Sequence, residues 1–179
     1  MGVLKEHINI EENYNKLVWI AFSIVTAFKI LLMGIFSSDY QIRMFMPFVE
    51  TFLSGERDPY DFYYKNQMLS SFPYPPLMLL IESIGGLFVQ WFHPGFNFLR
   101  NLLFKIPLLI FDILGFVFIR KISQKKIKYV FQLYFMSPVM LFAIYMHGQL
   151  DIIPTVLLLI AVYYLMKNEN KRDLLLFSV

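Results

Sequence analysis

The apolar residues of this chain fall into long blocks separated by polar connections, a pattern typical of helices that cross a lipid bilayer. A crossing helix needs about 20 mainly apolar residues to span a hydrocarbon core of about 30 Å. The block 77–92 is marginal: it is short and contains Glu82 and the pair Gly85-Gly86, so we expect an interfacial, re-entrant or short spanning segment there. The other blocks, which we predict to be membrane spans, are 17–36, 102–119, 129–146 and the shorter 152–166.

The connection after the first block is long and carries a helical pattern of its own. Apolar residues recur at helical spacing across 40–53, which predicts an amphipathic helix lying on the membrane. The sequence therefore predicts an all-α membrane protein. We expect a polytopic transmembrane helix bundle with an amphipathic interfacial helix in the first outer loop, forming a single membrane domain over 1–179. The apolar run 174–179 follows a charged connection, so we also expect the chain to be the N-terminal part of a larger protein.

Composition agrees with a membrane protein. The chain is 58% hydrophobic and 16% charged, whereas soluble domains are nearer half apolar and a quarter charged. The net charge of +3 does not indicate nucleic-acid binding, because the basic residues concentrate in connections beside the predicted spans. The absence of cysteine excludes disulfides, thiol catalysis and zinc–thiolate sites.

Charge leaves two topologies open. If 77–92 does not span, a cytoplasmic N-terminus places the basic connection 120–128 inside and places Asp39 and Asp151 together on the outer face. If 77–92 spans, an outer N-terminus satisfies the same rule and separates the two acids. The short length of that block favours the first topology. We therefore predict a multi-pass integral membrane protein with a cytoplasmic N-terminus.

Two acids at span ends are candidates for chemistry. Asp39 directly follows the first span, where it could act as a general base near a lipid-borne substrate or could be a solvated helix-end acid. Asp151 closes a run of functional groups that also contains His147 and Gln149. Amide and carboxylate groups bind sugar hydroxyls through directed hydrogen bonds. An ordinary polar turn remains the other interpretation of this run.

Two further segments of the long connection carry candidate functional groups. Three prolines surround Tyr74 and favour an extended backbone that directs the ring to the interface, although they also suit a plain helix start. Glu56, Asp58 and Asp61 supply oxygens that could hold a divalent cation. They lack the spacing of a calcium loop, which favours a polar turn.

Charged residues also occur inside the apolar blocks. Lys105 and Asp112 are two helical turns apart and therefore lie on one face of the same span. Buried charges in membranes pair or face a cavity, and we favour a structural role for these two. We expect Lys29, in the first span, to snorkel or to neutralise an anionic group.

The order of these motifs resembles the GT-C superfamily of multi-spanning glycosyltransferases. The likeness is to the mannosyltransferases of glycosylphosphatidylinositol synthesis, the glucosyltransferases of lipid-linked oligosaccharides and related bacterial enzymes. The segments that carry it, in chain order, are Asp39, Gly55 with Pro59-Tyr60, Tyr74-Pro75-Pro76-Leu77, Asp112, Ser137-Pro138 and Gly148-Gln149-Leu150-Asp151.

The resemblance implies transfer of a sugar from a polyprenyl-phosphate donor to a hydroxyl of a glycan, lipid or protein at the outer face, with inversion. Asp39 would be the catalytic base and Arg43 could pair with the phosphate. The expected substrate-binding residues are Arg43, Tyr74, His147, Gln149 and Asp151. No cofactor is certain, a divalent cation is possible, and a C-terminal half or second subunit is a possible partner. The alternative is a non-enzymatic transporter half or assembly subunit that uses Lys105 and Asp112 for permeation or helix association.

Overall fold

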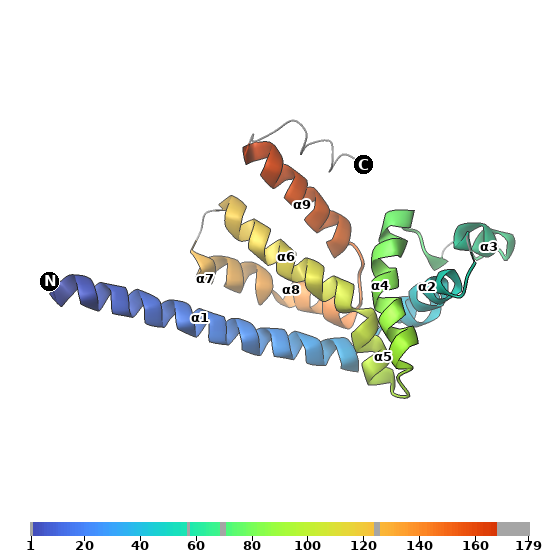
Figure 1. The fold of residues 1–179 in the computed structure, drawn as a ribbon, viewed down its shortest axis with the longest axis horizontal. Helices are drawn as coiled ribbons and strands as arrows, with labels where there is room; N and C mark the ends of the chain where they lie inside the picture. Colours follow the sequence, from blue (N-terminus) through green and yellow to red (C-terminus); the bar gives the residue numbers. More distant parts are fainter. Residues whose placement is uncertain (1, 57, 69–70, 124–125, 168–179) are drawn as a thin grey trace.

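The chain folds into helices. All regular structure among the described residues is helical and no strand occurs there (Figure 1), which confirms the predicted all-α class. The predicted run 174–179 lies outside the described part of the chain. The computed structural model describes residues 2–56, 58–68, 71–123 and 126–167, with side chains from residue 16 onward.

The first helix matches the first predicted span. Helix α1 covers Gly2–Ile35, and its segment Lys16–Ile35 is long and apolar enough to cross a membrane. It is the one described helix with this property on its own. The predicted block 152–166 forms α9, Ile152–Lys167, which is apolar but shorter.

The other two predicted spans are bent pairs of helices, each of which is long and apolar enough to cross a membrane only when the pair is taken as one span. The described residues therefore contain one clear spanning helix, or three if each bent pair is a single span. The first pair, bent by 44°, is α5 (Asn97–Phe104) and α6 (Ile106–Ser123). The second, bent by 43°, consists of α7 (Ile127–Val130), the π-helix η3 (Phe131–Phe135), α8 (Pro138–Met140) and the π-helix η4 (Leu141–Met146).

Proline explains both bends. Proline has no N–H, and its ring displaces the carbonyl four residues earlier. The second break precedes Pro138 and lies inside the predicted span 129–146. The first break lies at Lys105, which ends α5 and is followed by Pro107, so the predicted span 102–119 is divided between α5 and α6.

The long connection is also helical. The predicted helix over 40–53 is confirmed as the π-helix η1 followed by α2, yet its buried side packs against protein. A side chain at Gly86 would lie 2.6 Å from Val49, so α2 and α4 approach closely at this glycine. The elements of this connection and its end are η1 (Gln41–Phe45), α2 (Met46–Leu53), α3 (Pro59–Lys65) and α4 (Pro76–Phe92).

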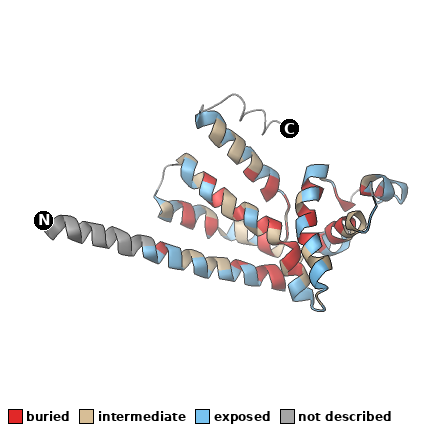
Figure 2. Cartoon of the chain, in the orientation of Figure 1, coloured by how far each residue is buried: buried red, intermediate tan, exposed pale blue. Residues whose placement is uncertain are grey.

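The arrangement of the helices gathers the core at one end of α1. In Figure 1, α1, α6 and the second bent pair run roughly along one direction, while α4 runs across it beside α2 and α5. Burial along α1 increases toward its C-terminal end (Figure 2), where Leu32 and Met33 join the main hydrophobic core. The polar connection therefore forms a helical cap over the ends of the long helices.

A buried charge network joins three of the long elements. Lys29 of α1 donates to Asp112 of α6 at 2.6 Å, and the Tyr145 hydroxyl of η4 donates to the same carboxylate oxygen at 2.5 Å. The Lys29 ammonium also lies 3.2 Å from the centroid of the Phe135 ring. The expected neutralising role of Lys29 is thus observed. Asp112 pairs with Lys29. Lys105, at the break between α5 and α6, donates to backbone carbonyls instead.

Candidate functional site

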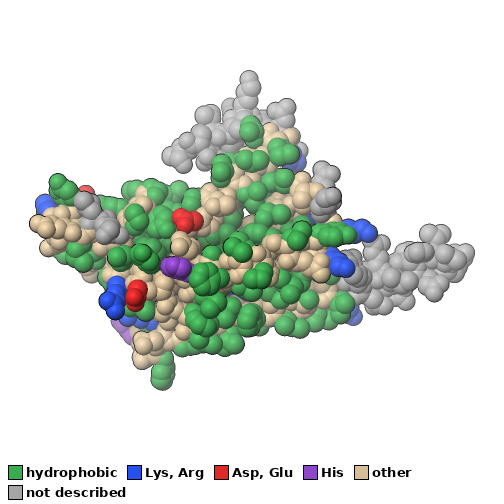
Figure 3. All heavy atoms as spheres, turned by 180° about the vertical axis from the view of Figure 1, so that it is seen from behind, with side chains coloured by type: hydrophobic (Ala, Val, Ile, Leu, Met, Phe, Trp, Pro, Cys, Tyr) green, Lys and Arg blue, Asp and Glu red, His purple; other side chains and the backbone are tan. Residues whose placement is uncertain are grey.

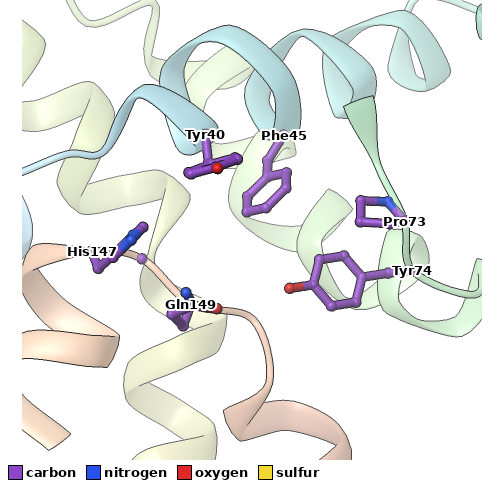
Figure 4. Close-up of a pocket in the computed structure, with 7 residues that line it drawn as sticks. Tyr40, Phe45, Pro73, Tyr74, His147 and Gln149 are labelled. Carbon is purple, nitrogen blue, oxygen red and sulfur yellow. The ribbon is translucent and has the colours of Figure 1, made fainter. Parts of the chain in front are cut away.

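A pocket of about 170 Å³ lies where the first connection meets the segment after η4. Three chain segments that are far apart in sequence form it, and Figure 4 shows their side chains converging on one space. The predicted substrate-binding residues Tyr74, His147 and Gln149 all belong to this pocket. The complete lining is Tyr40, Phe45, Pro73, Tyr74, His147, Gly148 and Gln149.

Two rings form one side of the pocket. Tyr40 and His147 lie in a stacked arrangement, with ring centroids 6.0 Å apart and planes inclined by 27°. The chain reaches this position through Gly148, whose φ of +74° lies in the left-handed region that favours glycine. A side chain at Gly148 would also lie 2.7 Å from the amide oxygen of Gln41. Glycine is therefore required here for both conformation and space.

Tyr74 forms the opposite side. Its ring contacts Phe45 edge to face, with centroids 5.7 Å apart, and its carbonyl accepts a hydrogen bond from the Tyr60 hydroxyl at 2.8 Å. Burial, followed by the negative charge of Asp151 and a hydrogen bond to it, raises the pKa of Tyr74 to about 12. Asp151 therefore acts on the pocket through Tyr74, which remains a neutral hydroxyl at physiological pH.

Asp39 and Arg43 lie on the surface beside the pocket. Asp39 directly precedes Tyr40, and its side chain is 82% exposed. Arg43 Nε lies 3.5 Å from Asp39 Oδ1, so the residue expected to pair with phosphate pairs with the expected base. Both side chains are accessible to a substrate that approaches from outside. Their roles in binding and catalysis remain predictions.

Gln41 is a polar residue of this region that sequence reasoning missed. It is 1% exposed, and neither its amide nitrogen nor its amide oxygen has a hydrogen-bond partner. Its oxygen lies against Gly148 of the pocket lining. No pattern in the sequence indicated this, because Gln41 is one polar residue among many in the connection and only the fold places it against Gly148.

The acidic cluster of the connection forms a polar turn. Asp58 caps α3 by accepting a hydrogen bond from the Asp61 backbone N–H at 3.0 Å, and Asp61 pairs with Lys65. Glu56 accepts from the Asp58 backbone N–H at 3.5 Å. Within the described part of the chain, no group of three or more His, Cys, Asp or Glu side chains is arranged to hold a metal ion.

Comparison of the chain with protein-family models, with curated proteins and with solved structures finds no match. The likeness to the GT-C superfamily therefore remains a prediction from the motifs of the sequence. The geometry of the pocket stands beside it as an independent observation.

Proposed function

We propose that this chain is a multi-pass membrane segment of a glycosyltransferase that uses a polyprenyl-phosphate sugar as its donor. The observation that carries the proposal is the pocket itself. It gathers Tyr74, His147 and Gln149, three residues expected to bind substrate, and it adds Tyr40. Asp39, the expected base, adjoins Tyr40 on the accessible surface.

The course of the chain supports placing the pocket on the outer face. Successive long elements alternate in direction (Figure 1), so the end of α1 and the start of α9 lie together, opposite the turn between α6 and α7. Four basic residues are exposed near the end of α6 and the start of α7: Arg120, Lys121, Lys126 and Lys128. Figure 3 shows blue side chains near this end of the molecule and a largely apolar flank. Because positive residues favour the cytoplasmic side, the pocket end faces outward.

The direction of α4 supports the same topology. It runs across the long elements in Figure 1, and it is an apolar helix of 17 residues. A helix in that orientation lies at the interface when the long elements cross the membrane. Asp39 and Asp151 then share the outer face, as the first of the two topologies requires.

The lining of the pocket suits a sugar ring. Aromatic faces pack against the apolar C–H face of a ring, and the hydroxyl of Tyr74 and the amide of Gln149 supply directed hydrogen bonds at its edge. The neutral Tyr74 hydroxyl, bonded to Asp151, remains able to accept from a ligand hydroxyl. Small-molecule sites in general combine an apolar or aromatic lining with a few polar groups that fix the orientation of the ligand.

The reaction follows from the residues at the rim. The Asp39 carboxylate takes the proton of the acceptor hydroxyl, whose oxygen attacks the anomeric carbon while the bond from that carbon to the lipid phosphate breaks. The phosphate leaves with the electron pair and the configuration inverts. Arg43 exchanges its contact with Asp39 for a phosphate oxygen. That exchange costs little, because an exposed ion pair contributes about 0–1 kcal/mol.

The binding part of this proposal is tested with donor in nanodiscs. Polyprenyl-phosphate mannose and polyprenyl-phosphate glucose are titrated onto the protein, and binding is measured by thermophoresis. Replacing an aromatic or hydrogen-bonding group in the pocket removes about 1–3 kcal/mol, so Tyr40→Ala and His147→Ala each weaken binding about 10- to 100-fold. Trp91→Ala, at an 81% exposed aromatic outside the pocket lining, is the matched control. Equal donor affinity in all variants would place the donor elsewhere.

The alternative of a transporter half or assembly subunit assigned Lys105 and Asp112 to a permeation path or to helix association. Both side chains are fully buried. Asp112 is held by Lys29 and Tyr145, and Lys105 bonds the carbonyls of Phe36 and Tyr145. These contacts support a packing role for both residues.

A further inference from the structure

Lys105 is a buried cation at the break between α5 and α6. Its side chain is fully buried, and its ammonium donates to the backbone carbonyl of Phe36 at 2.6 Å and to that of Tyr145 at 3.0 Å. Among the described ion pairs, none within 4.0 Å involves this ammonium. Two backbone carbonyls from separate parts of the chain are therefore its observed partners.

Those carbonyls belong to the ends of two helical elements. Phe36 directly follows α1, and Tyr145 lies in the last turn of η4. The last carbonyls of a helix lack partners within the helix and carry the negative end of its dipole. A single ammonium thus satisfies two helix ends at once and receives a favourable electrostatic environment from both.

Both helix ends lead directly into the pocket. Tyr40 lies four residues after Phe36, and His147 lies two residues after Tyr145. The stem of Lys105 also lies beside Gly148, the residue that follows His147, because a side chain placed on Gly148 would lie 3.6 Å from Lys105 Cε. The ammonium and its stem therefore contact the segments that present both stacked rings.

We propose that Lys105 is the positioning residue of the pocket: it fixes the spacing between the segment that carries Tyr40 and the segment that carries His147. The effect of Lys105 on donor binding rests on the proposed function. The effect of Lys105 on the spacing of the two segments concerns the protein without ligand. Loss of the ammonium leaves two buried carbonyls without their donor. The two segments then separate, and the stacked pair of rings is no longer held at one distance.

The geometric part is tested by distance measurement between spin labels. The chain contains no cysteine, so labels are attached only at introduced sites. Asp39→Cys and Pro154→Cys are suitable because both residues are exposed. Asp39 adjoins Tyr40, and Pro154 lies in the first turn of α9, which follows the segment that carries His147. In protein without ligand, we expect a narrow distance distribution with Lys105 and a broader or shifted one in Lys105→Met. The Lys105→Arg variant, which keeps N–H donors, restores a narrower distribution.

Two controls separate positioning from general loss of structure. Lys128→Met removes an exposed lysine and leaves the distribution unchanged. Circular dichroism establishes whether Lys105→Met retains its helices. If this variant does not fold, the distance distributions of Lys105→Arg and Lys105→Gln are compared instead; the glutamine keeps an amide on a shorter stem, and its distribution should be the broader of the two. An unchanged distribution in a folded variant without the ammonium would overturn the proposal.

A second measurement distinguishes this proposal from the proposed function. Titration of polyprenyl-phosphate mannose onto Lys105→Met should show at least tenfold weaker binding when the distance distribution broadens. Broadening with unchanged donor affinity supports the positioning role and counts against donor binding at this pocket. Weaker binding with an unchanged distribution would overturn the positioning role, because Lys105 would then act on the donor in another way.

Discussion

The buried pair of Lys29 and Asp112 provides a quantitative prediction about stability. Their charged atoms are 2.6 Å apart and both side chains are fully buried. Lys29→Met keeps the apolar stem and removes the charge, so the carboxylate of Asp112 loses its counter-charge and keeps the hydrogen bond from the Tyr145 hydroxyl. Removing one partner of a buried ion pair costs about 3–5 kcal/mol, because the remaining charge is desolvated and uncompensated.

The double variant separates the pair from ordinary loss of packing. Asp112→Asn alone leaves the Lys29 ammonium without a counter-charge. Combined with Lys29→Met, it leaves no buried charge and still gives the Tyr145 hydroxyl an oxygen to donate to. We therefore expect the double variant to be more stable than either single variant, with the two changes far from additive.

The measurement is reversible unfolding in mixed micelles with increasing SDS, followed by circular dichroism. Lys128→Met, at an exposed lysine, is the matched control and should change the free energy of unfolding by no more than about 0.5 kcal/mol. If Lys29→Met resembles this control, or if the two changes in the double variant simply add, the mutual compensation of the two buried charges does not stabilise the fold.

Three further outcomes follow. Subtracting the ultraviolet pH titration of the Tyr74→Phe variant from that of the protein should show a tyrosine that ionises near pH 12. Asp151→Asn removes the negative charge and should lower the pKa of Tyr74; an unchanged pKa in this variant contradicts the contact between the two residues. Because the raised pKa favours neutral Tyr74 in the folded state, its contribution to stability is present below about pH 10 and is lost as pH rises toward 12. Gly148→Ala places a side chain at a φ of +74° and close to Gln41, so it should lower the free energy of unfolding by about 1–3 kcal/mol; a neutral effect in micelle unfolding would refute the packing described. With impermeant thiol reagents on intact cells, Ser38→Cys should be labelled and Lys126→Cys should not, and the reverse pattern contradicts the topology.

Local patterns predicted the elements of this fold well. The apolar block 17–36 and the proline at 138 act through neighbouring residues, so a helix long and apolar enough to span a membrane and the second break could be anticipated. The break at Lys105 was missed because the apolar character of 102–119 outweighed the presence of Pro107. A proline near the start of an apolar block is therefore a sign of a helix boundary.

Contacts between distant segments could not be predicted in the same way. Asp112 and Lys29 are 83 residues apart, so the spacing of Lys105 and Asp112 within one block suggested a shared face but not their partners. Similarly, the motifs containing Tyr74 and His147 were each visible, but only packing of the connection against the end of η4 places them around one pocket.

Sugar transfer in membranes that contain this protein tests the proposed function most directly. Radiolabelled polyprenyl-phosphate mannose and glucose are supplied as donors, and transfer to the extractable and protein fractions is measured. Asp39→Asn removes the proton acceptor and should lower the rate about 10²- to 10⁴-fold. Asp61→Asn, at an acid paired with Lys65 outside the pocket, should leave it nearly unchanged. Transfer that survives Asp39→Asn within a few-fold, or no transfer from either donor by the unaltered protein, would contradict the account.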